Sequence, residues 1–197
     1  MMSIVSKAGE PVFYTYTQCH CNMTEYILRN LDAQERAMQE FDRHLSCSKY
    51  QETIDDIKAK AEQANREREY QQKLINIFGY VPTADEIELH KRVAQAEAGG
   101  TESVDGIELV MCVGANRCRS NRFPNTLTGV YYQTNQYETV ITGRIWRCTV
   151  NNKVEQAWQN MLERGYCRDA NVLFFTAGGY NSYCTPAYRY GNHYFGY

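Results

Sequence analysis

Apolar residues recur at intervals of three, four and seven positions over much of this chain, which predicts a mainly helical fold. One helix is expected to open at Asn22, because Glu25 follows it at the spacing of a capping box. The same signal, Ser48 with Gln51, predicts a second helix after a bend. Residues 22–80 are therefore expected to form a helical extension.

The second helix keeps a seven-residue apolar period through a strongly charged stretch, which is typical of a docking or oligomerisation helix. Gly79 can adopt the left-handed conformation that ends this helix, and Pro82 prevents it from resuming. The alternative interpretation is that both helices fold back on the rest of the protein.

A short arm, residues 1–21, precedes this extension. Residues 12–17 are rich in strand-forming side chains and follow the turn signal Gly9-Glu10-Pro11. One strand or an extended segment is expected there.

A third capping box, Thr83 with Glu86, predicts a helix over residues 84–98 that the glycine pair after it stops. The next helix is expected to begin near Ser103. Its residues 107–115 are apolar on nearly every side, so this helix is expected to be the central one.

The remaining elements are shorter. A helix is expected over residues 154–164, and residues 172–175 form a short buried piece of undecided type. Asn116 and Arg117, at the end of the central helix, are better explained by structural roles than by substrate contact. Thr126 is expected to cap a helix that follows a proline turn.

The amino-acid composition and net charge exclude some classes of protein. The 197 residues are 43% hydrophobic and 22% charged, enough for one solid core and an accessory region. The net charge of -2 provides no basic field for nucleic acid, and no apolar run reaches the length of a membrane span. No secretory signal pattern opens the sequence, so we expect synthesis in the cytoplasm without a signal peptide.

Eight cysteines are present, and without an export signal reduced thiols are the default expectation. Cys19, Cys21, His44 and Cys47 could together form a tetrahedral zinc site, although their spacing fits no standard zinc finger. Disulfides are the less favoured alternative.

Glu97 is the candidate for acid chemistry. It stands where a helix should end, and the partial negative charge of a helix C-terminus disfavours the carboxylate and raises its pKa. A protonated carboxyl near neutral pH can donate to the leaving oxygen of a glycosidic bond. On spacing alone, an ordinary solvated surface glutamate is the commoner interpretation.

From about residue 83 onward the chain resembles the SleB-type cell wall hydrolases, which include spore-cortex-lytic enzymes. The resemblance rests on six motifs in sequence order: the E-A-x-G segment at residues 96–100, the N-R pair at Asn116-Arg117, the F-P-N-T…V-Y-Q block at residues 122–133, the Q-F pair at Gln136-Tyr137, the apolar L-Y-F at residues 172–175, and the terminal G-N-H-x-F at residues 191–195.

This resemblance implies a lysozyme-like domain of the goose-type or lytic transglycosylase kind at residues 83–197. It implies cleavage of peptidoglycan between N-acetylmuramic acid and N-acetylglucosamine, with no metal or organic cofactor. The family's single catalytic glutamate maps onto Glu97. The family commonly has a second glutamate directly after E-A-x-G, where this chain has Thr101 followed by Glu102.

The same motifs imply substrate-binding roles for other polar residues. Sugar hydroxyls and acetamido groups are expected to be held by Gln136, Tyr137, Asn192, His193 and Tyr194. His193 is equally well interpreted as an interior histidine. Four acidic residues are candidates for a second acid, of which Glu138 is favoured over Glu102, Asp105 and Glu108.

The sequence therefore supports two alternative functions. The first is a wall-cleaving enzyme, as a phage lysin or a lysozyme of a virion tail, that acts at the bacterial wall and contacts other virion proteins, or itself, through residues 1–80. The second is a structural or adaptor subunit whose lysozyme-like domain binds the wall without cutting it.

Overall fold

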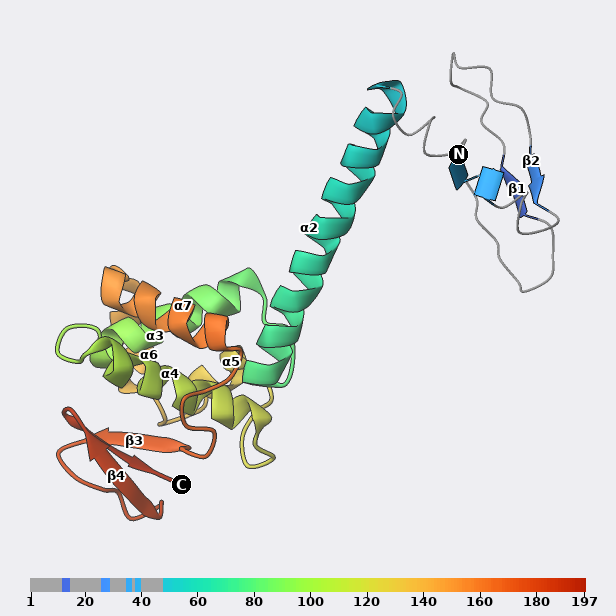
Figure 1. The fold of residues 1–197 in the computed structure, drawn as a ribbon. Helices are drawn as coiled ribbons and strands as arrows, with labels where there is room; N and C mark the ends of the chain where they lie inside the picture. The colour runs from blue at the N-terminus through green and yellow to red at the C-terminus, as the bar shows by residue number, and fades with distance from the viewer. Residues whose placement is uncertain (1–11, 15–25, 29–34, 37, 40–47) are drawn as a thin grey trace. The chain divides into compact units, whose positions relative to one another are not determined.

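The computed structural model describes residues 12–14, 26–28, 35–36, 38–39 and 48–197 (Figure 1). The chain divides into two compact units, Met1–Arg66 and Glu67–Tyr197. No helix in these described ranges is both long and apolar enough to cross a membrane.

In the first unit, β1 (Val12–Tyr14) pairs with β2 (Tyr26–Leu28) in an antiparallel ribbon. The strand expected near Val12 is confirmed. The helix expected from Asn22 is wrong over Tyr26–Leu28, because these aromatic and branched side chains suit a paired strand as well as a helix. Residues 35–36 and 38–39 are helical.

The helix α2 (Ser48–Phe78) begins and ends where the sequence predicts, and Gly79 follows it in the left-handed conformation, with φ of 84°. Its last turns carry fully buried side chains, Leu74, Ile77 and Phe78, that belong to the core of the second unit. The second compact unit starts at Glu67. The start of the hydrolase domain that is expected from the sequence, residue 83, lies further along the chain.

The capping box at Thr83 is present with both hydrogen bonds, and α3 (Ala84–Ala98) follows it. The next helix, α4 (Val104–Arg119), has Ser103 as its N-cap. Both helices therefore begin at the residues that the sequence signals.

Helix α4 is the central helix of the second unit and packs against α3 and α7 (Asn152–Arg164) (Figure 1). Every residue from Gly106 to Cys118 is buried, as its apolar circumference predicts. Gly114 lets the Tyr131 ring approach the helix, since a Cβ there would collide with the Tyr131 hydroxyl.

Three short helices cover one end of this core: α5 (Leu127–Tyr131), α6 (Glu138–Ile141) and the 3-10 helix η1 (Arg144–Trp146). Thr126 caps α5 with its side chain, as expected. Helix α3 contacts all three. Thr128 of α5 bonds Glu86 in its first turn, whereas Thr139 of α6 bonds Glu97 in its last turn.

Residues 172–175 lead into a strand. The three-stranded antiparallel sheet has the order β3 (Phe174–Ala177), β5 (His193–Gly196), β4 (Pro186–Tyr190), and β3 packs against α4 (Figure 1). His193 and Phe195 lie buried on the inner face of β5. The sheet thereby carries the terminal G-N-H segment to the helical core.

Candidate active site

A cavity of about 490 Å³ lies where the end of α3 meets α6, η1 and the inner face of the sheet. Polar and ionisable side chains dominate its wall. They are Gln95, Glu97, Thr101, Arg117, Gln136, Glu138, Thr139, Thr142, Arg144, Thr176 and His193.

Glu97 enters this cavity from the last turn of α3. The helix ends at the next residue, and the Gly99 amide closes it by donating to the carbonyls of Ala94 and Gln95. The Thr139 hydroxyl donates to Glu97 Oε1 at 2.7 Å. The end of the helix and one hydroxyl thus fix the direction of this carboxyl.

Burial is the main influence on Glu97 and raises the pKa of its carboxyl above the ordinary value. The negative charge of Glu138 raises it further, whereas the Thr139 hydrogen bond and electrostatic interactions with His193 and Arg144 lower it. The net shift is upward, as the sequence predicts, although desolvation rather than the helix terminus is the first cause. A raised pKa favours a proton donor.

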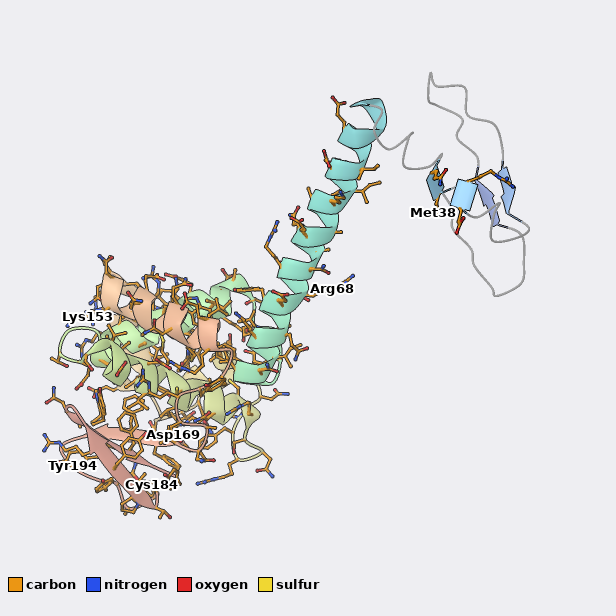
Figure 2. All side chains as sticks on the ribbon, viewed as in Figure 1. Met38, Arg68, Lys153, Asp169, Cys184 and Tyr194 are labelled. Atoms are coloured by element: carbon orange, nitrogen blue, oxygen red, sulfur yellow. The ribbon has the colours of Figure 1, made fainter. Side chains whose placement is uncertain are left out.

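The residues expected to hold sugar separate into two groups. Gln136, Tyr137 and His193 line the cavity. Asn192 and Tyr194 are not among its lining residues. Tyr194 alternates with His193 along β5 and meets Tyr180 and the Arg189 guanidinium instead (Figure 2).

Tyr137 forms part of the wall while remaining buried. Its ring meets the Tyr131 ring edge to face, with centroids 4.9 Å apart, and Arg117 lies over it. Burial raises the pKa of Tyr137 to about 12. Its hydroxyl is buried and has no hydrogen-bond partner among the described residues.

Asn116 and Arg117 tie the central helix to the chain that enters the sheet. The Asn116 amide donates to the carbonyls of Asp169 and Val172, at 2.9 Å each. Arg117 donates to the Leu173 carbonyl and to Gln136 Oε1. These bonds support the expected structural roles, and Arg117 in addition orients Gln136 at the cavity.

The four acids weighed as a second carboxyl have different surroundings. Glu138 lines the cavity and is exposed at the start of α6. Asp105 pairs with Arg168, and the fully buried Glu108 pairs with Arg164. Glu102 is buried beside His193, behind the cavity wall.

Sequence reasoning missed Thr139 and Arg144. Neither lies in a family motif that we recognised, and a threonine or arginine in a short helix carries no signal of its own. Only the folding of α6 and η1 over the end of α3 brings them to Glu97. The zinc ligands considered above, Cys19, Cys21, His44 and Cys47, lie outside the described residues.

A half-buried carboxyl with a raised pKa, in a polar cleft, is the arrangement by which a single acid protonates a glycosidic oxygen.

Residues 101–196 match the cell wall hydrolase family. The fold is similar to the catalytic domain of the germination-specific lytic transglycosylase SleB from Bacillus anthracis, at 22% identity and a TM-score of 0.50, over 58% of this chain and 96% of that one. It is equally similar to the SleB catalytic domain of Bacillus cereus, at 21% identity and a TM-score of 0.50, over 59% and 92% of the two chains. No curated protein sequence matches the chain.

The family match covers just under half of the chain, and the similarity to the SleB catalytic domains concerns the fold. The family match begins after Glu97, so the matched range does not include that residue.

Proposed function

We propose that this domain cleaves the glycan strands of peptidoglycan between N-acetylmuramic acid and N-acetylglucosamine, with Glu97 as the only catalytic acid and base. One observation carries the proposal: Glu97 lies in the polar cavity of a cell wall hydrolase domain, with burial that favours its protonated form. The fold shared with the SleB catalytic domains supports it.

The reaction follows from a single carboxyl. The protonated Glu97 donates its proton to the glycosidic oxygen, the bond from the muramic C1 to that oxygen breaks, and the substrate's acetamido oxygen supports the cation at C1. The muramic 6-hydroxyl then attacks C1 and returns its proton to the Glu97 carboxylate. The product is an anhydro-muramic end, and no second carboxylate is required.

The test is the clearing of a suspension of purified peptidoglycan by the wild type and by Glu97→Gln. The variant should clear at least about a hundredfold more slowly, because general acid catalysis contributes that much or more. Glu88→Gln is the matched control, since Glu88 lies on the same helix but pairs with Arg92 away from the cavity. Its rate should equal that of the wild type.

The alternatives give distinct outcomes. Equal clearing by the wild type and Glu97→Gln would remove Glu97 from its role. A folded wild type that binds peptidoglycan without clearing it would instead favour the adaptor function. Mass spectrometry of the products separates transglycosylation from hydrolysis, since an anhydro end is lighter than a hydrolysed end by one water.

We further propose that the enzyme works as a phage lysin or a virion tail lysozyme, with residues 1–80 as its docking or self-association element. The charged, mostly exposed residues of α2 before Leu74 support this role. Light scattering of the full chain tests self-association. A monomeric mass at high protein concentration would refute that part of the proposal.

A further inference from the structure

His193 is the least explained polar group of the cavity wall. It belongs to the inner face of β5, and its side chain is only 7% exposed. Its ring packs edge to face against the Phe175 ring, with centroids 5.4 Å apart. Its Nδ1 atom is buried without a hydrogen-bond partner among the described residues and lies 3.4 Å from Glu102 Oε1.

The Glu102 carboxylate is held in place by the same G-N-H segment that carries His193. The Asn192 amide donates to Glu102 Oε1 at 2.8 Å. Gly191, with φ of 55°, leaves the space that Glu102 fills, since a Cβ there would collide with the carboxylate. Gly106 does the same from α4, where a Cβ would lie 2.9 Å from Glu102 Oε2.

A buried carboxylate without a guanidinium or ammonium partner is costly, and folding alone gives no reason to keep one. Asp105 and Glu108, on the following helix, each pair with an arginine. The Glu102 carboxylate pairs with no arginine among the described residues, and the imidazole of His193 is the ionisable group that faces it. Its position is therefore better explained by the histidine than by stability.

We propose that Glu102 is a positioning residue for the cleavage reaction, and that it acts through His193; this inference rests on the proposed function. The negative charge of the carboxylate, 3.4 Å from Nδ1, favours the tautomer in which Nδ1 carries the proton. The other ring nitrogen, Nε2, then keeps its lone pair in the cavity that Glu97 shares.

An acceptor at that place suits the substrate. A sugar bound against Glu97 presents hydroxyl and acetamido N–H donors, and Nε2 accepts one of them. This hydrogen bond orients the sugar while Glu97 protonates the glycosidic oxygen. Without Glu102 the ring is free to adopt the opposite tautomer, in which Nε2 is a donor and the bond to the sugar is lost.

The pair is tested on the full chain with Glu102→Gln, His193→Ala and the double variant, in the peptidoglycan-clearing assay. Glu102→Gln keeps the volume and an acceptor for the Asn192 amide but removes the charge. Each single variant should lose about tenfold to a hundredfold in maximal rate. The double variant should be no slower than His193→Ala, because the two residues act as one unit.

A merely structural Glu102 would give a different result. In that case Glu102→Gln would lower the melting temperature, and the double variant would clear peptidoglycan more slowly than His193→Ala. Asp105→Asn is the matched control, since that carboxylate pairs with Arg168 outside the cavity wall, and its rate should remain that of the wild type.

Nitrogen NMR of the wild type tests the tautomer without any variant. At a pH where the imidazole is neutral, the His193 signals should show protonated Nδ1 and unprotonated Nε2. The opposite tautomer, or full clearing by a folded Glu102→Gln, would overturn this inference. A wild type that fails to clear peptidoglycan would overturn the proposed function instead, and the tautomer would still report on the pair.

Discussion

Replacing Phe78 with alanine tests whether the end of α2 is part of the enzyme core. The Phe78 side chain is 1% exposed and packs edge to face on His90, with centroids 5.3 Å apart, and against Trp158 at 6.2 Å. Truncating a buried phenylalanine costs about 3–5 kcal/mol. That is a large fraction of the roughly 5–15 kcal/mol by which a domain is stable, and corresponds to about 10–20 °C in melting temperature.

Urea unfolding followed by Trp158 fluorescence and by far-ultraviolet circular dichroism measures the loss. Ile57→Ala on the same helix is the control, because Ile57 is 59% exposed and its truncation should change the free energy of unfolding by less than about 0.5 kcal/mol. A loss below about 1 kcal/mol for Phe78→Ala would refute the placement of this helix end in the core.

Two further predictions concern pH. Thr139→Val removes the hydroxyl that stabilises the Glu97 carboxylate, so the pKa of Glu97 should rise further and the alkaline limb of the clearing rate should move to higher pH; an unmoved limb would contradict this contact. Burial lowers the pKa of His90 from 6.5 to about 3, so the unfolded chain binds the proton more tightly. The contribution of His90 to stability should be fully present above about pH 6.5 and fall by up to about 1.4 kcal/mol per pH unit towards pH 3. In urea titrations, His90→Gln should flatten this pH dependence. An equally steep profile for the variant would assign the loss of stability in acid to other groups.

Local signals in the sequence identified most element boundaries correctly. The capping box at Thr83 and the glycine at 79 work through contacts between near neighbours, so they can be recognised without the fold. The helix predicted over Tyr26–Leu28 is wrong because a strand depends on a partner strand. That partner, Val12–Tyr14, lies elsewhere in the sequence, so local signals do not reveal it.

For the candidate site, too, some residues could be identified from the sequence and others only from the fold. Motif resemblance and a helix end were enough to single out Glu97, and a buried position in the cavity agrees with that choice. They were not enough to separate His193 from Tyr194, which are adjacent in the motif. Successive side chains of a strand point to opposite faces, and only the packing of β5 on the core decides which face meets the cavity.

By itself, then, the sequence indicated a mainly helical protein, a resemblance to the SleB-type hydrolases, the limits of its main helices and a candidate acid, Glu97. The tertiary structure alone decided which side chains surround that acid. Thr139 and Arg144 lie more than forty residues along the chain from Glu97, and Glu102 is separated from His193 by the whole second half of the protein. Such contacts arise from packing between distant segments, and no local pattern of residues encodes them.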